Sequence, residues 1–246
     1  MKIIGISGRK QAGKNTVANY INGCVLENKK MVEEFFIDDD GNLGVKTADN
    51  NDKVGYGIFD VTRKDSTFIE YAENNLWPYI KVYHFADPLK EMAINLFDLN
   101  PLEVYGNDTQ KNMKTNIMWE SMPNNIANKT GRMTNREFLE HFGTNIIRQI
   151  KFDVWSEFTL KRILSEKSEI AIIPDVRFPN EISAIKNAGG IVIRLTRDLF
   201  NSDAKAECAL DKNIYDWSNF DIIIDNANFT LTQLCLELKT LKSYWS

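Results

Sequence analysis

Short apolar runs alternate with amphipathic stretches along most of the chain. Isoleucine-rich runs cover residues 2–7, 170–174, 191–195 and 220–224, and residues 79–85 return to the same character after a long polar interval. Apolar runs of this length, bounded by turn residues, are typical of buried strands. The pattern therefore predicts five strands of a central sheet.

Helical periodicity fills the intervals between these runs. Apolar residues recur at spacings of three and four within residues 15–24, 87–96, 134–164 (with a break), 180–188 and 231–241. A capping box, Thr134 to Glu137, opens the third of these helices, and Pro88 stands in the first turn of the second. Strands that alternate with helices predict a mostly parallel sheet covered on both faces, a three-layer α/β/α fold.

Two stretches depart from this alternation. Residues 27–75 are acidic and polar, and the turn sequence at residues 38–42 predicts a hairpin-bearing insertion. Residues 100–133 are polar and contain no clear element, so we expect loops and short helices at the mouth of a site, some of them mobile. We expect residues 1–246 to form a single domain with the insertion inside it.

Composition narrows the class of protein. The 246 residues are 43% hydrophobic, which suits a buried core, and the net charge of −4 argues against a surface that tracks nucleic acid. No run approaches the length of a membrane span, and the N-terminal apolar stretch is too short for a signal peptide. Three widely spaced cysteines suggest reduced thiols. We therefore expect a cytoplasmic protein without membrane or nucleic-acid partners.

The strongest local motif is the glycine loop at residues 8–16, which matches the G-x-x-x-x-G-K pattern between a strand and a helix. Glycines let successive backbone N–H groups point at a phosphate chain, and the helix N-terminus adds partial positive charge. Lys14 would reach the outer phosphates. The alternative is a glycine turn that only joins strand to helix, but the lysine and the context favour an ATP site.

The residue after Lys14 departs from the pattern. A Ser or Thr hydroxyl normally binds Mg²⁺ at this position, but the chain has Asn15 followed by Thr16. Contact with Mg²⁺ could run through Thr16, through the Asn15 carbonyl or through water, and the sequence does not distinguish these.

A second motif follows the strand at residues 170–174. Asp175 and Arg177 stand at its carboxyl end, where open α/β sheets bind ligands. Asp175 could orient a substrate phosphate and Arg177 could neutralise one; the alternative is a turn aspartate paired with a surface arginine. Glu181 could accept from a base or sugar hydroxyl, or could be an ordinary helix-start charge.

A third group lies in the helical pattern after residue 134. Arg136 and Arg148 could clamp phosphates, because a guanidinium matches phosphate oxygens bidentately. Gly143–Thr144 inside a helix suggests close approach by a ligand or by another element. We expect His141 to be packed or at the surface rather than catalytic, because phosphoryl transfer needs positioning and charge neutralisation more than a strong base. Spacing alone favours a core position for Trp155 over a base-stacking role.

A fourth motif is the helix start after residue 85. Asp87 and Lys90 could frame a nucleotide, although on spacing alone we favour a helix start with a solvated lysine.

In chain order these motifs resemble the bacteriophage deoxynucleoside monophosphate kinases. The resemblance rests on Gly-Lys-Asn-Thr at the loop, Phe-Ala-Asp-Pro-Leu-Lys at residues 85–90, Arg-Glu-Phe-Leu-Glu-His-Phe-Gly-Thr at 136–144 with a later Arg and Trp, Pro-Asp-Val-Arg at 174–177 followed by Asn-Glu, and Phe-Asp-Ile-Ile-Ile-Asp-Asn at 220–226. Residues 27–75 then correspond to a variable insertion. The resemblance implies a P-loop kinase fold with lid and monophosphate-binding segments.

It also implies roles for individual residues. The ATP phosphates would be held by Gly8, Lys10, Ala12, Gly13, Lys14, Asn15 and Thr16. The acceptor pocket would be lined by Asp87, Lys90, Arg136, Gly143, Thr144, Trp155, Asp175, Arg177 and Glu181. Catalysis would use Lys14, Arg136, Arg148, Asp175 and Arg177. A His-x-x-Glu-like segment of the family is present only as Glu207, with Ala204 at the histidine position.

The implied reaction is in-line transfer of the ATP γ-phosphoryl group to the 5′-phosphate of a deoxynucleotide, with Mg²⁺. The acceptor phosphate is already anionic, so no strong general base is needed. Arg132, Arg136 and Arg148 are candidates for an arginine that moves in on closure. The resemblance makes a homodimer plausible, and a phage-encoded protein would work in the host cytoplasm.

Other functions stay open at this point. The same scaffold could phosphorylate phosphomevalonate or dephospho-coenzyme A. A nucleotide-binding module or ATPase that drives a partner protein, or an inactive relative, would also carry this loop, although the intact Lys14 and Asp175-x-Arg177 weigh against inactivity.

Overall fold

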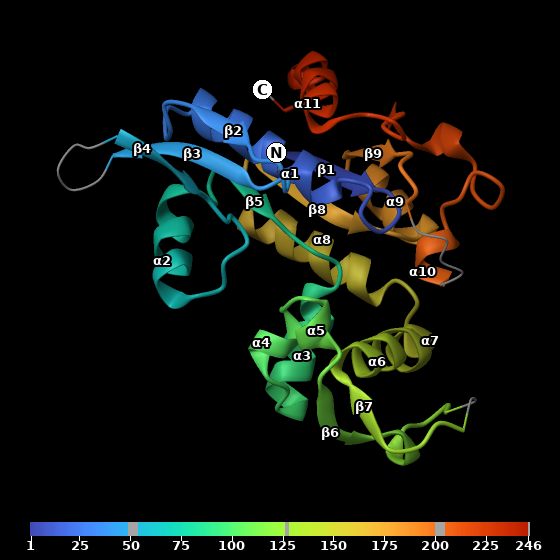
Figure 1. Cartoon of the computed structure of the whole chain (residues 1–246). Coiled ribbons are helices and arrows are strands. Elements are labelled where there is room, and N and C mark those ends of the chain that lie inside the picture. The colour runs from blue at the N-terminus through green and yellow to red at the C-terminus, as the bar shows by residue number, and fades with distance from the viewer. Residues whose placement is uncertain (49–53, 126–127, 200–204, 246) are drawn as a thin grey trace. The chain divides into compact units, whose positions relative to one another are not determined.

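The computed structural model describes residues 1–48, 54–125, 128–199 and 205–245, which form two compact units (Figure 1). The first unit comprises Met1–His84 and Leu160–Ser246, and the second comprises Phe85–Thr159. Across these ranges, no helix combines the length and the apolar character that a membrane span needs.

A parallel five-stranded sheet forms the centre of the first unit, with the order β10-β9-β1-β8-β5. The strands are β1 (Lys2–Ser7), β5 (Ile80–Val82), β8 (Ile170–Val176), β9 (Ile191–Leu195) and β10 (Ile222–Ile224). Each lies within or around one of the predicted apolar runs, which confirms the α/β fold with a parallel sheet. β1 pairs with both β8 and β9, so Ser7 lies opposite Val176 and Arg194. The carboxyl ends of three strands therefore meet around the end of β1.

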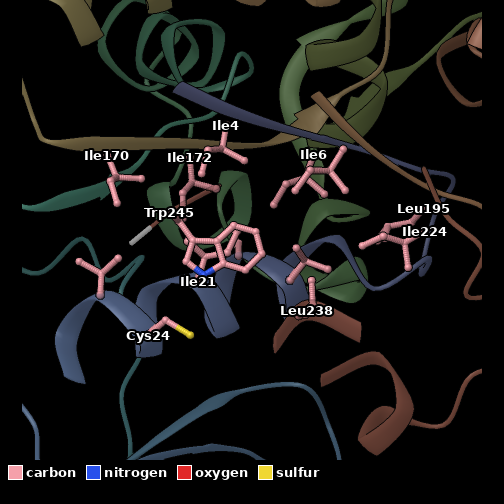
Figure 2. Packing of buried hydrophobic residues seen from close by; sticks show 14 of the residues in the cluster. Ile4, Ile6, Ile21, Cys24, Ile170, Ile172, Leu195, Ile224, Leu238 and Trp245 are labelled. Carbon is pink, nitrogen blue, oxygen red and sulfur yellow. The ribbon is translucent and has the colours of Figure 1, made fainter. Parts of the chain in front are cut away.

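Helices cover both faces of this sheet (Figure 1). α1 (Lys14–Asn28) and α11 (Leu231–Thr240) lie on one face, and α9 (Pro179–Asn187) lies on the other. Side-chain alternation explains the arrangement, since Ile4 and Ile6 join the α1 core while a Cβ on Gly5 would lie 2.7 Å from Ile185 of α9. On the α1 face the buried indole of Trp245 packs among side chains of the sheet, α1 and α11 (Figure 2).

The remaining elements of this unit include three short helices. These are α10 (Lys205–Cys208), η3 (Trp217–Asn219) and η4 (Lys242–Tyr244). α1 is longer than the predicted helix because the buried Val25 and Leu26 continue its apolar face beyond residue 24. β5 is shorter than predicted, since only Ile80–Val82 pair with β8.

The predicted insertion contains the expected hairpin. β2 (Phe35–Ile37) and β3 (Leu43–Ala48) pair in antiparallel fashion across the turn at residues 38–42, and β4 (Val54–Ile58) extends the sheet. Asp38 closes the turn by accepting from the N–H groups of Asp40 and Asn42. α2 (Ser66–Asn75) was not predicted from the sequence, because only Phe68 and Ala72 of this polar helix are buried.

The turn of this hairpin packs against the start of α1. Gly41 has φ of +83°, and a Cβ added there would lie 2.3 Å from Thr16 Oγ1. We expect Gly41→Ala to lower the free energy of unfolding by roughly 2 to 3 kcal/mol, because a left-handed conformation and a steric clash both oppose the methyl group. Denaturant unfolding measures the loss.

Gly55→Ala is the matched control for this variant. An added Cβ at the exposed Gly55 of β4 meets nothing within 4 Å, so its unfolding free energy should stay within about 0.5 kcal/mol of the native value. Equal stability of the two variants would show that the turn does not depend on a glycine.

The second unit contains more regular structure than predicted. Its elements are α3 (Asp87–Phe97), α4 (Pro101–Val104), α5 (Asp108–Lys111), β6 (Lys114–Met118), η1 (Trp119–Ser121), β7 (Arg132–Thr134), α6 (Asn135–Glu140), the π-helix η2 (His141–Ile147) and α7 (Arg148–Ile150). The expectation of no clear element in residues 100–133 was wrong for β6, which pairs with β7. β6 buries only Thr115 fully, so it lacks the apolar alternation that identifies a strand.

The predicted capping box and interrupted helix are both present. Thr134 accepts from the N–H of Glu137, and the Glu137 carboxylate accepts from the N–H of Thr134. The helical path then runs through α6, η2 and α7, and after a break resumes in α8 (Val154–Glu166). Stacked Phe138 and Phe142, with Phe97 at their edges, anchor this path in the core of the unit.

Candidate functional site

The glycine loop lies at the carboxyl end of the central strand, as predicted. It leaves β1 at Ser7 and enters α1 at Lys14 through Gly13, which caps the helix with φ of +97°. This left-handed cap suits glycine, since other residues adopt the conformation at a cost. The loop therefore places the free N–H groups of the α1 N-terminus beside the ends of β8 and β9.

Lys14 lies folded over its own loop. Its Nζ donates to the carbonyl oxygens of Gly8 and Arg9, both at 2.6 Å. Burial, and after it the nearby Arg177, lower the pKa of this ammonium to about 8, and Glu207 partly opposes both effects. Lys14 therefore shares one electrostatic environment with side chains from β8 and from α10.

The pKa of Lys14 predicts how ATP binding depends on pH. Phosphate binds the charged ammonium better, so affinity should fall as the pH rises through about 8, by up to about tenfold per pH unit. Calorimetric titration with ATP and Mg²⁺ between pH 7.5 and 9.5 measures this, since the ATP phosphates are already ionised there. Lys14→Met should remove the dependence, and an unchanged slope in that variant would assign it to another group.

Arg177 forms an ion pair that no sequence motif predicted. Its Nη1 lies 2.5 Å from Glu207 Oε1, and the other carboxylate oxygen, Oε2, accepts from the backbone N–H of Lys10 at 2.7 Å. Glu207 thus bridges the end of β8 and the glycine loop. Ala204, the residue at the histidine position of the family segment, lies outside the described residues.

Glu181 serves the backbone at the end of β8. Its buried carboxylate accepts from the N–H groups of Arg177 at 2.7 Å and Phe178 at 3.1 Å. These contacts are those of a helix-start charge, and contact with a base or sugar hydroxyl stays a prediction. The carboxylate fixes the backbone that carries Arg177.

A second set of charges ties the segment after α10 to the loop. The Arg9 guanidinium donates to Asp211 at 2.5 and 3.1 Å and lies 3.2 Å from Asp198. Arg194 of β9 donates to Ser7 at 3.0 Å and lies 3.9 Å from the same Asp211. These contacts hold residues 207–211 beside the loop.

Asn226 supports the loop from the other side. This fully buried side chain donates to the Ala12 carbonyl at 2.8 Å and accepts from the N–H of Arg197 at 2.9 Å. Two features of the sequence point to Asn226: it ends the segment 220–226 that carries the family resemblance, and it follows the last strand, at the edge where open α/β sheets bind ligands.

The loop and the strand beside it offer oxygen donors for a metal ion. Asn15 is exposed in the first turn of α1, Thr16 faces Gly41 of the insertion, and Asp175 is half-buried at the end of β8. Within the described ranges, no cluster of three or more His, Cys, Asp and Glu side chains could cage a metal. Mg²⁺ is commonly bound by one or two protein oxygens together with phosphates and waters, so these donors fit it.

The second unit holds the other predicted site residues. Arg136 donates to Asp108 at 2.7 Å and to Asn112 at 3.3 Å from the exposed face of α6. Lys90 lies 3.9 Å from Asp87 and over the ring of Tyr105. The cations thus have local partners, and Lys90 is only partly exposed rather than fully solvated.

Gly143 and Thr144 lie in the π-helix η2, a conformation that is often found at functional sites. A Cβ on Gly143 would lie 2.6 Å from Leu89 of α3, which confirms the close approach of another element. Trp155 is buried and donates to the Gly143 carbonyl at 3.3 Å. Its burial matches the core position that spacing favoured.

His141 and Arg148 are the other two candidate side chains of this unit. His141 is buried, with Nε2 at 2.7 Å from the Pro123 carbonyl and Nδ1 at 3.1 Å from Asn145 Nδ2, so of the two expected positions, packed or at the surface, it takes the packed one. The half-buried Arg148 lies with its guanidinium 6.0 Å from the centre of the Phe152 ring.

Comparison with known proteins relates the chain to a protein family and to a viral protein. A family model described as deoxynucleotide monophosphate kinase matches residues 2–235. A protein of Acanthamoeba polyphaga mimivirus, named "Putative deoxynucleotide monophosphate kinase", is 26% identical over 145 residues, which are 58% of this chain and 72% of the viral protein.

Proposed function

Because the chain belongs to the deoxynucleotide monophosphate kinase family, we propose that it transfers the γ-phosphoryl group of ATP to the 5′-phosphate of a deoxynucleoside monophosphate. The observation that carries the proposal is the family match over residues 2–235, because that range includes both the glycine loop and the Asp175-x-Arg177 motif. The kinase assignment itself makes the protein a phosphotransferase; the donor and the acceptor are the proposed part.

On the donor side, the glycine loop would hold the ATP phosphates through the groups at the N-terminus of α1. Gly13 sets the start of the helix, so the N–H groups of Lys14, Asn15 and Thr16 are those without a helical carbonyl partner. Lys14 would turn from the carbonyls of Gly8 and Arg9 to the outer phosphates, where its charge offsets the charge on the transferring group.

Mg²⁺ would bind at Asn15 or Thr16, with Asp175 as a further oxygen donor, and would neutralise phosphate charge. The protein residues do the positioning. Asp175 stands at the end of a buried strand, next to the strand that leads into the loop. A rigid strand end is a suitable support for a group that must orient a substrate phosphate.

On the acceptor side, we assign charge neutralisation to Arg177 in the first unit and to Arg136 and Arg148 in the second. A nucleoside monophosphate is a dianion near neutral pH and attacks without a strong general base. The packed position of His141 agrees with a reaction that needs no general base, since both ring nitrogens already contact protein groups, the Pro123 carbonyl and Asn145. Gly143, Thr144 and Trp155 would help to line the acceptor pocket.

A coupled ADP-release assay with ATP and Mg²⁺ tests the proposal. The acceptor panel contains all four deoxynucleoside monophosphates, the ribonucleotides, phosphomevalonate and dephospho-coenzyme A. We expect turnover with one or more deoxynucleotides well above the rate with water alone. Turnover with phosphomevalonate or dephospho-coenzyme A instead would move the protein to another acceptor class. ATP binding without turnover on any acceptor would favour a partner-driven ATPase or an inactive relative.

A further inference from the structure

The glycine loop already holds an anion that belongs to the protein itself. Glu207 presents one carboxylate oxygen to the N–H of Lys10 and the other to the guanidinium of Arg177. A loop N–H and an arginine are the donors expected to bind oxygens of a phosphate group. The carboxylate therefore occupies donors that a bound nucleotide would use.

Two observations indicate that this contact is built into the fold. The Glu207 side chain is only 11% exposed, although most glutamates of a soluble protein are solvated. The following turn is anchored by Arg9, which donates twice to Asp211 and also contacts Cys208 Sγ at 3.8 Å. Arg9 is itself part of the loop. The loop therefore both binds the Glu207 carboxylate, through Lys10, and holds the segment that carries Glu207, through Arg9.

From this geometry we infer that Glu207 is an internal competitor for the phosphate-binding groups of the loop and thereby sets which anions can occupy it. The inference rests on the proposed function, because it concerns the ATP site. An anion that needs the Lys10 N–H or Arg177 must first displace the carboxylate. Weakly bound anions such as inorganic phosphate would fail to do so, whereas a polyphosphate chain offers enough contacts to succeed.

Displacement also supplies a role for Arg177 during the reaction. In the structure its guanidinium is neutralised by Glu207 at 2.5 Å. Once phosphates take the loop, the same guanidinium is released toward a second phosphate. Donor binding would thus prepare the group that we assign to the acceptor, which makes Glu207 a positioning residue that acts through Arg177.

Calorimetric titration of the full chain with inorganic tripolyphosphate at pH 7.5 tests the inference. Glu207→Gln removes the charge and keeps the shape. We expect it to bind tripolyphosphate about tenfold more tightly than the native protein, the factor for a competing contact that is formed roughly nine-tenths of the time. Glu73→Gln, an exposed glutamate of α2, makes the same charge change and should leave the affinity unchanged.

Glu207→Asp tests whether anion binding is opposed by the direct contacts of Glu207 or only by its negative charge. Aspartate keeps the charge, but its shorter side chain cannot reach both Lys10 and Arg177 from a segment anchored by Asp211. We therefore expect tighter tripolyphosphate binding in this variant as well. Native affinity in Glu207→Asp, or in Glu207→Gln, would overturn the inference.

Lys14→Met distinguishes failure of the inference from failure of the proposed function. Loss of tripolyphosphate binding in Lys14→Met, together with native affinity in both Glu207 variants, would contradict the competitor role of Glu207. The assignment of the loop as the ATP site would then still stand. Unchanged binding in Lys14→Met would show that tripolyphosphate does not use the loop, and the proposed function would lose its donor site along with the inference.

Discussion

A Lys14→Met variant is expected to retain less than about 1% of the native turnover, since removing one charge-stabilising donor typically costs two to three orders of magnitude. The methionine keeps most of the aliphatic stem but cannot neutralise the transferring phosphoryl group. The loop carbonyls of Gly8 and Arg9 lose their donor, but they lie at the edge of a loop that Asn226 also holds. Steady-state rates in the ADP-release assay measure the loss.

The same variant should stay folded. Burial disfavours the charged form of Lys14, as its lowered pKa shows. A neutral side chain at this position therefore avoids the free-energy cost of burying a charge. We expect a melting temperature equal to or above that of the native protein. Lys239→Met on the exposed side of α11 is the control and should keep native turnover. Near-native turnover in Lys14→Met would remove the phosphate-loop assignment.

The core elements could be predicted from sequence because a parallel sheet buried on both faces requires continuous apolar runs. β1 and β9 match the predicted limits for this reason. The elements that were not predicted bury few side chains: α2 buries Phe68 and Ala72, and β6 buries Thr115. Such elements depend on tertiary partners that a local pattern does not contain.

The candidate site divides in the same way. The glycine loop was visible because its chemistry is local, from Gly8 to Thr16. The contact between Glu207 and Lys10 joins residues 197 positions apart, and that between Asn226 and Ala12 spans 214. No spacing rule reaches that far. These partners become visible only when the sheet brings the ends of β1, β8, β9 and β10 to one edge.

Arg177→Met should separate acceptor use from donor binding. Arg177 stands on a backbone that Glu181 fixes, and its guanidinium lies close enough to Lys14 to lower the pKa of that ammonium. We expect kcat/KM for the deoxynucleotide to fall by roughly 10²- to 10³-fold, while the ATP dissociation constant changes less than about threefold. ATP binding changes little because the lost charge is partly offset by release of Glu207. Acceptor-dependent kinetics and calorimetry with ATP measure the two quantities separately.

A pH profile provides an independent readout of this variant. Without the neighbouring guanidinium, the pKa of Lys14 should rise above its native value of about 8, so ATP binding should begin to weaken at a higher pH than in the native protein. Arg162→Met, which removes a partly exposed arginine paired with Glu166 on α8, should change neither the profile nor the turnover. Equal losses of ATP binding and of acceptor use in Arg177→Met would place Arg177 on the donor side, because only a group that contacts the donor phosphates could weaken both steps alike.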